Sequence, residues 1–220
     1  MNRLKFFFAA IITLTLFNIS IAQDIKRFEF ESAYVEKTFE TKTAGIEIKT
    51  TKKIYITEYG NKMASYDTEI RNILMLNTVD SSRSVSITDG EWVTAYDPDT
   101  NEGTRMKIPF LDTIGKMSEE DMEKFGKQMA EALKTDITDV GTKEIAGKTC
   151  NVTKAVTDMM GMKTTTTTAL YKNFVMEIVS EGMGTNVNEL VTKFEEGIDI
   201  NPTVFEAHKD VIIKEIKTPF

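Results

Sequence analysis

The segment "DPDTNEG", residues 97–103, offers the oxygen ligands that a hard cation such as Ca²⁺ prefers. Asp97, Asp99 and Asn101 stand at the spacing of the first three ligands of a calcium-binding loop. Such a loop also needs glycine at its sixth position and glutamate at its twelfth, where this chain has Glu102 and Ile108. We therefore interpret the segment as a hairpin turn with Asx-type hydrogen bonds and expect no metal there.

A methionine-rich stretch is the second candidate for metal chemistry. Met159, Met160 and Met162 lie close together in the chain, and Met176 and Met183 follow. Thioethers suit Cu(I), but methionine is also a flexible filler of irregular apolar surfaces. Because no histidine accompanies these thioethers, the sequence favours packing over copper binding.

The chain has one cysteine, Cys150, and one histidine, His208. Cys150 shares a strand phase with Val152, which indicates a buried, inert thiol, and His208 follows Phe205 in a charged turn at the surface. The sequence has no Gly-x-Ser-x-Gly motif that would place a serine beside a histidine. One cysteine also excludes an internal disulfide and a Cys/His zinc cluster. We expect neither enzyme activity nor a cofactor.

The N-terminal segment, residues 1–22, has the organisation of a secretory signal peptide. Arg3 and Lys5 precede an apolar run over residues 6–17, which is shorter than the roughly 20 residues of a membrane span. A small-x-small pattern ends at Ala22. We expect cleavage there, leaving residues 23–220 as one soluble exported domain, without a lipid-accepting cysteine at its start, in the periplasm or outside the cell.

The charge of the chain limits its partners. It has 27 basic and 34 acidic residues and a net charge of −7. Loss of Arg3 and Lys5 with the leader leaves 25 basic residues and a net charge of −9. An acidic exported protein lacks the clustered lysine and arginine that phosphate backbones and anionic membrane surfaces attract. We expect no nucleic-acid partner and no membrane span.

Alternating apolar and polar residues, interrupted by short turns, predict an antiparallel meander of about ten strands. Turns are expected at residues 43–45, 60–61, 89–90 and 146–147, and a short helical turn begins at Pro202.

The hairpin "EWVTAYDPDTNEGTRMKIP", residues 91–109, carries the single tryptophan. Trp92 and Tyr96 share one phase of its first strand, and Met106 and Ile108 share one phase of the return strand. We predict that these four side chains lie together on the inner face of a curved sheet.

One segment, "MSEEDMEKFGKQMAEALKTD" (residues 117–136), has helical rather than strand periodicity. Met122, Phe125, Met129 and Leu133 form an apolar stripe, which a helix of this kind must bury against the sheet. The predicted fold class is α+β, mainly β: a curved antiparallel sheet or incomplete β-barrel with one main helix on its concave face.

This layout resembles the outer-membrane lipoprotein-sorting superfamily (LolA/LolB-like proteins), in particular its small exported members. The resemblance extends over nearly the whole mature chain and rests on three segments: "TDGEWVTAYDPDTNEGTRMKI", "IAGKTCNVTKAV" and "INPTVFEAHKDVIIKEI". It implies a half-barrel around helices, with an apolar cavity for acyl chains and a phenylalanine before the last strand that plugs the core.

Two hypotheses of different classes follow. The first is a binding protein or carrier for a hydrophobic ligand, such as a lipid acyl chain or a lipid-modified protein. The second is a structural or interaction protein with a filled core that binds a partner through its surface or a sheet edge. In the first hypothesis the cavity is lined by Phe28, Phe30, Ile46, Ile48, Trp92, Tyr96, Met106, Ile108, Met122, Phe125, Met129 and Leu133.

Overall fold

A computed structural model describes residues 26–107, 124, 128, 135–159, 162–182 and 184–216. Within these ranges the chain forms twelve strands and two short 3₁₀ helices. The strands are β1 (Ala33–Thr43), β2 (Ile46–Thr57), β3 (Lys62–Ile73), β4 (Thr78–Asp89), β5 (Trp92–Asp97), β6 (Glu102–Lys107), β7 (Thr135–Ile145), β8 (Lys148–Met159), β9 (Met162–Tyr171), β10 (Phe174–Gly182), β11 (Thr185–Glu196) and β12 (Ile212–Ile216). The 3₁₀ helices are η1 (Glu58–Gly60) and η2 (Pro202–Phe205).

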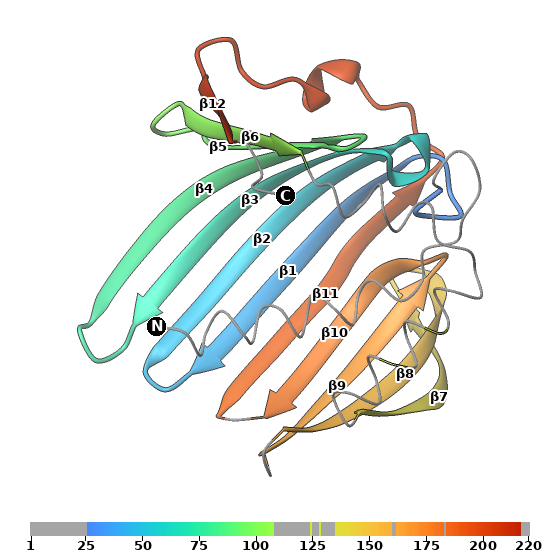
Figure 1. The fold of residues 1–220 in the computed structure, drawn as a ribbon. Helices are drawn as coiled ribbons and strands as arrows, with labels where there is room; N and C mark the ends of the chain where they lie inside the picture. The colour runs from blue at the N-terminus through green and yellow to red at the C-terminus, as the bar shows by residue number, and fades with distance from the viewer. Residues whose placement is uncertain are drawn as a thin grey trace.

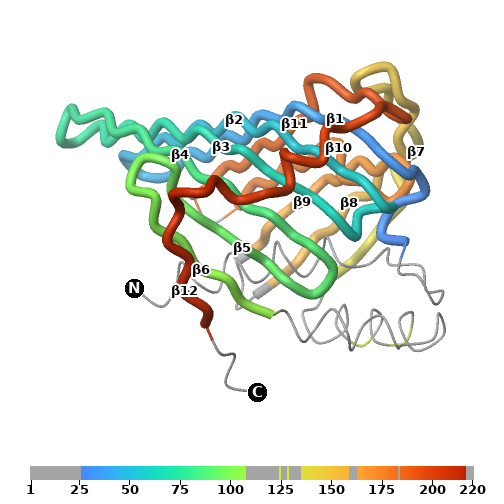
Figure 2. Tube along the Cα trace, turned by 90° about the horizontal axis from the view of Figure 1, so that it is seen from above, coloured from blue at the N-terminus to red at the C-terminus, as the bar shows by residue number. Residues whose placement is uncertain are grey.

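All twelve strands belong to one sheet, in the order β12-β6-β5-β4-β3-β2-β1-β11-β10-β9-β8-β7. The meanders β1–β6 and β7–β11 are joined where β1 pairs antiparallel with β11. The short edge strand β12 pairs with β6 in parallel. The sheet bends along this order, so that β4–β6 and β7–β9 lie on the two sides of an open arch (Figure 1, Figure 2).

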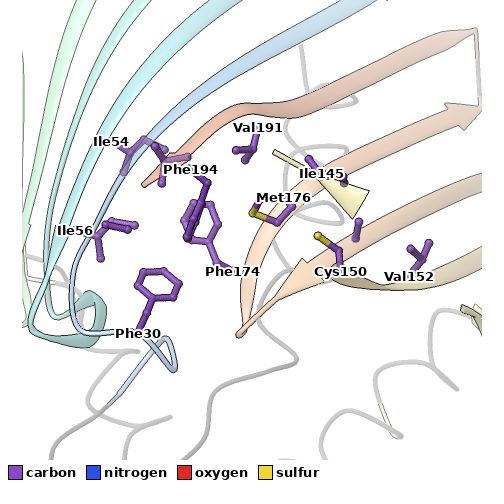
Figure 3. Close-up of a cluster of buried hydrophobic side chains, with 13 residues drawn as sticks. Phe30, Ile54, Ile56, Ile145, Cys150, Val152, Phe174, Met176, Val191 and Phe194 are labelled. Carbon is purple, nitrogen blue, oxygen red and sulfur yellow. The ribbon is translucent and has the colours of Figure 1, made fainter. Parts of the chain in front are cut away.

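The larger apolar core fills one end of the arch. Phe30, from the segment before β1, is 2% exposed, and its ring meets the edge of the Phe194 ring at 5.3 Å. Figure 3 shows side chains of β2 converging with those of β8, β10 and β11 on this interior. We call this set the inner cluster; it comprises Phe30, Ala33, Val35, Ile54, Ile56, Ile145, Cys150, Val152, Ala169, Phe174, Met176, Val191 and Phe194.

A smaller core lies on the opposite, convex face of β3–β5. Residues 198–211 cross this face, and Phe205 in η2 is 8% exposed among its apolar side chains. The Tyr66 hydroxyl donates to the carbonyl oxygen of Val204 at 2.8 Å. We call this set the outer cluster; it comprises Ala64, Val85, Ile87, Tyr96, Ile200 and Phe205. The phenylalanine before the last strand therefore covers the outside of the sheet rather than plugging its hollow.

The predicted turns are confirmed. The reversals at residues 44–45, 90–91 and 146–147 connect antiparallel neighbours, and η1 with Asn61 connects β2 to β3. Gly60 has φ +90°, and a Cβ atom there would lie 2.6 Å from the Phe28 ring, so this position requires glycine. The helical turn that begins at Pro202 is confirmed as η2, where the Asn201 side chain accepts from the amide of Thr203.

The prediction of a curved antiparallel sheet is confirmed, but the number of strands is not: the described residues contain twelve rather than about ten. The mixed phases of "TNVNELVTKFEE" belong to one long strand, β11, whose alternation changes at a register shift opposite Glu36 and Lys37. The predicted helix lies outside the described residues except for Lys124 and Gln128, whose backbone is helical. The predicted signal peptide lies outside them entirely. Among described residues, no helix has the length and apolarity to traverse a membrane.

Candidate functional site: the concave face

The register of β1 and β2 determines which side chains the arch encloses. Val35 pairs with Ile54 and Ala33 with Ile56, and all four belong to the inner cluster. Because strand side chains alternate between faces and directly paired residues share a face, odd-numbered residues of β1 and even-numbered residues of β2 lie on the concave side. Lys37 is the next concave residue after Val35.

Four charged residues cross the middle of the concave face from β11 to β3. We call Glu189, Lys37, Lys52 and Asp67 the charged row. Lys37 Nζ lies 2.6 Å from Glu189 Oε1, and Lys52 Nζ lies 2.9 Å from Asp67 Oδ2. Lys37 and Lys52 are directly paired across β1 and β2, which places two like charges side by side between two carboxylates.

Lys37 is the least accessible member of the row. Its side chain is 7% exposed, against 32% for Lys52, and its Nζ lies 4.6 Å from the centre of the Phe174 ring. Burial lowers the pKa of Lys37, its contact with Glu189 opposes this shift, and the positive charge of Lys52 adds to it. Burying an ammonium group is costly in free energy unless the group is paired. Lys37 is thus a desolvated positive charge beside the apolar core, and its pairing with Glu189 compensates part of that cost.

Two irregularities of the sheet lie next to this row. The β1–β11 register shifts between Glu36 and Lys37, and the β10–β9 register shifts between Val175 and Glu177. Bulges increase local twist and re-aim side chains, and they are frequent beside functional sites. Lys37 directly follows the first shift, and the Phe174 ring beneath its Nζ belongs to the residue just before the second.

On the other side of the row from the inner cluster, the concave face carries apolar side chains between threonines and the Glu69–Arg71 ion pair. Phe39 follows Lys37 in phase on β1, and Ile46, Ile48 and Ile73 continue the same face on β2 and β3. All four are half-buried; we call them the half-buried stretch. The concave face thus has a sealed apolar end, a charged centre and a partly accessible end where apolar and polar side chains are mixed.

The predicted lining residues fall into different places. Phe28 and Phe30 stack at 5.1 Å in or against the inner cluster, although they precede β1 rather than continue its alternation. Tyr34, which follows them in β1, pairs with Tyr55 on the convex face. Ile46 and Ile48 lie on the concave face within the half-buried stretch.

The prediction that Trp92 and Tyr96 lie on one face with Met106 is wrong. In the β5–β6 register Trp92 pairs with Lys107 and Tyr96 with Gly103, whereas Met106 pairs with Val93. Phase within a single strand does not reveal its alignment with the next strand. Trp92 instead packs on the convex face, with the Arg105 guanidinium 4.4 Å from its ring centre, and Tyr96 joins the outer cluster.

Five predicted lining residues, Ile108, Met122, Phe125, Met129 and Leu133, lie outside the described residues. That the predicted residues other than Trp92 and Tyr96 line a ligand cavity stays a prediction.

The acidic hairpin turn has the predicted Asx-type geometry. Asp97 Oδ1 accepts from the backbone amides of Asp99 at 2.7 Å and Thr100 at 3.3 Å. The carboxylate of Asp99 accepts hydrogen bonds from Arg83 on β4. In the part of the chain that the structure describes, no group of three or more His, Cys, Asp or Glu side chains is arranged to hold a metal ion.

The single cysteine and the single histidine are placed as predicted. Cys150 is fully buried in the inner cluster and donates weakly to the carbonyl oxygen of Lys148, and burial raises the pKa of its thiol. The His208 side chain is 69% exposed beside Asp210. Neither position brings together a nucleophile and a base.

The charged row itself was not predicted from the sequence, although a signal for it is present. Lys37 continues the alternation of Ala33 and Val35, and Lys52 precedes Ile54 and Ile56 in phase. A lysine at a position where the alternation predicts an apolar residue indicates either that the faces of the strand are assigned wrongly or that the charge is buried and paired. The partner, Glu189, stands 152 positions further along the chain, and only the fold brings it near.

No protein-family model and no curated protein matches this chain. Among solved structures, the chain is similar to an uncharacterized conserved protein from Thermus thermophilus, with a TM-score of 0.50 and 9% identity over 86% of this chain and 92% of that one. This likeness extends to the fold alone.

Two further structural matches are weaker. MucB in the MucA/MucB complex of Pseudomonas aeruginosa aligns with a TM-score of 0.47 and 11% identity, over 84% of this chain and 59% of that one. An outer membrane lipoprotein-sorting protein domain from Vibrio parahaemolyticus aligns with a TM-score of 0.23 and 10% identity, over 81% and 91%. Membership of the lipoprotein-sorting superfamily stays a prediction.

Proposed function

We propose that this chain is an exported, non-enzymatic binding protein or carrier that holds a hydrophobic ligand on the concave face of its sheet. The ligand class is a lipid acyl chain, free or on a lipid-modified protein. The observation that carries the proposal is the half-buried stretch, where Phe39, Ile46, Ile48 and Ile73 extend the apolar interior beyond the sealed inner cluster.

The energetics of this surface fit an apolar ligand. Burial of apolar area contributes about 25 cal/mol per Å², so covering a few hundred Å² of such surface supplies several kcal/mol. The stretch from Lys37 to Thr43 advances along β1 by about 20 Å at the rise of a strand. A long acyl chain can lie along a track of this length.

The proposal is tested by binding of cis-parinaric acid, a fluorescent fatty acid, together with native mass spectrometry of protein purified without detergent. We expect saturable binding and a co-purified amphiphile. Ile48→Lys places a charge on the concave track and is expected to weaken probe binding at least about tenfold, or 1.4 kcal/mol. Its neighbour Glu47 lies on the convex face, so Glu47→Lys should bind like the wild type. Equal binding by both variants, or none by the wild type, would contradict the proposal.

A second candidate function, partner binding through a sheet edge, is favoured by the two edge strands of the described sheet. β7 exposes Ile137 at 51% and Val140 at 59%, and β12 exposes Ile212 at 65%. An edge strand with unpaired backbone groups can accept a strand of another protein. This second function would be favoured if the wild type bound no amphiphile and if Ile137→Lys abolished binding of a partner protein.

A further inference from the structure

Resting on the proposed function, we infer that the ligand is a single-chain amphiphile with an anionic head group, which the ammonium groups of Lys37 and Lys52 bind at the centre of the concave face. The shared chemistry is one carboxylate or phosphate on an acyl or alkyl chain. The tail then extends from the charged row over the half-buried stretch.

The order of charges across the row supports an anionic head group. From β11 to β3 the row places a carboxylate, two ammonium groups and a carboxylate in sequence, as Glu189, Lys37, Lys52 and Asp67. Directly paired side chains in a sheet have Cβ atoms about 5 Å apart, and like charges at that separation repel. The contacts with Glu189 and Asp67 offset this repulsion in part, and an anion between the two lysines offsets it further.

The lysines also have hydrogen-bonding capacity for such an anion. Within the described ranges, Lys37 donates to Glu189 and Lys52 to Asp67, whereas an ammonium group carries three donors. Hydrogen bonds between ionised partners are about twice as strong as neutral ones, and a low local dielectric strengthens them further. Lys37, 7% exposed against the Phe174 ring, lies in such surroundings.

The position of the row relative to the apolar surface sets the orientation of the ligand. On one side, Val35 and Ile54 belong to the sealed inner cluster, at 0% and 7% exposure. On the other side, Phe39 and Ile48 are half-buried. A head group at Lys37 and Lys52 therefore directs the tail toward Phe39 and Ile48, where apolar surface is accessible.

The test displaces cis-parinaric acid from the full-length mature protein with three competitors of one chain length: palmitate, cetyl phosphate and cetyl alcohol. We expect palmitate or cetyl phosphate to compete at least about tenfold more strongly than the alcohol, as a charge-assisted hydrogen bond implies. Comparison of the two anions distinguishes a carboxylate from a phosphate source. An alcohol that competes as well as both anions overturns the inference and leaves the proposed function standing.

Two lysine variants provide the matched control. Lys52→Met removes the more exposed cation of the row and keeps a long side chain. In this variant the two anions should compete about as strongly as the alcohol. Lys53 is adjacent in sequence but points to the convex face, in register with Glu36, so Lys53→Met should keep the full preference. Equal loss in both variants, or in neither, contradicts the inference. Absence of any probe binding by the wild type contradicts both this inference and the proposed function.

Discussion

At the scale of single residues, the most consequential placement is that of Lys37. The β1 alternation directs its side chain to the concave face, while its pairing with Glu189 at 2.6 Å allows the charge to be buried. Breaking such a pair by removing one partner typically costs about 3–5 kcal/mol, because the other charge stays buried without compensation. The pair thus makes the centre of the concave face polar at a cost that apolar residues would not incur.

The variant Glu189→Gln tests whether the pair with Glu189 compensates the buried charge of Lys37. We expect it to lower the free energy of unfolding by about 3–5 kcal/mol at pH 7. The pKa of Lys37 is already lowered, so its folded state releases the proton before its unfolded state does. The loss should therefore shrink as pH rises toward the ordinary lysine value of 10.5, because a neutral amine is less costly to bury. Urea unfolding of the wild type and the variant between pH 7 and 10.5 measures this difference in the free energy of unfolding.

The control for that variant is Glu40→Gln, which breaks the exposed pair between Glu40 and Lys49. Exposed pairs contribute about 0–1 kcal/mol. A Glu189→Gln loss no larger than that of the control, or one independent of pH, would contradict the assignment of a buried charge to Lys37.

Glu196 gives a second prediction at this scale. Burial raises its pKa, but hydrogen bonds from Lys172, Tyr171 and Lys148 outweigh burial, and the pKa is lowered overall. A lowered acid pKa contributes stability above the unfolded value of about 4.5 that is lost as pH falls through the folded pKa. Glu196→Gln should lose about 1–2 kcal/mol at pH 7 and show a shallower loss of stability in acid.

Acid titration of the melting temperature measures this effect. Glu195→Gln is the control, because Glu195 lies on the other face in an exposed pair with Lys193. If Glu196→Gln kept the full acid dependence of the wild type, another carboxylate would be responsible for it.

At the scale of elements, the residues that the sequence could assign are those whose partners lie nearby in the chain. The hairpins with Ala44-Gly45, Gly90-Glu91 and Ala146-Gly147 follow from turn chemistry and alternation, which are local. The mutual register of β5 and β6 depends on the turn at residues 98–101, and alternation within each strand did not reveal it, so the face assigned to Trp92 was wrong. Lys37 was missed for a different reason, since its partner strand is remote in sequence.

The segment after β11 is an element whose role depends on one side chain. Residues 198–211 are held on the convex face by Phe205 and by the Tyr66 hydroxyl. Phe205→Ala should detach this segment, since truncation of a buried phenylalanine costs about 3–5 kcal/mol. We expect faster tryptic cleavage at Lys209 and Lys214 while the rest of the sheet stays resistant.

Glu206→Ala, at the exposed neighbouring position, should leave the rate of cleavage unchanged. If trypsin cleaved the wild type and Phe205→Ala at equal rates, the outer cluster would not be what holds the segment on the convex face.

At the scale of the whole molecule, one open sheet separates two apolar regions. The convex region is closed by the chain's own C-terminal segment, whereas the concave region continues past the charged row into a half-buried stretch. A curved sheet has a hollow interior only if its concave side chains leave part of their surface available. We therefore expect the ligand to bind at the concave face and nowhere else.

Methyl NMR of ¹³C-isoleucine-labelled protein, titrated with palmitate, measures this most directly. Isoleucines report on both faces, with Ile46, Ile48 and Ile73 on the concave stretch and Ile70 and Ile87 on the convex face. We predict saturable shift changes at the three concave methyl groups and none at the two convex ones. Shifts confined to Ile70 and Ile87, or the absence of any shift, would contradict ligand binding on the concave face.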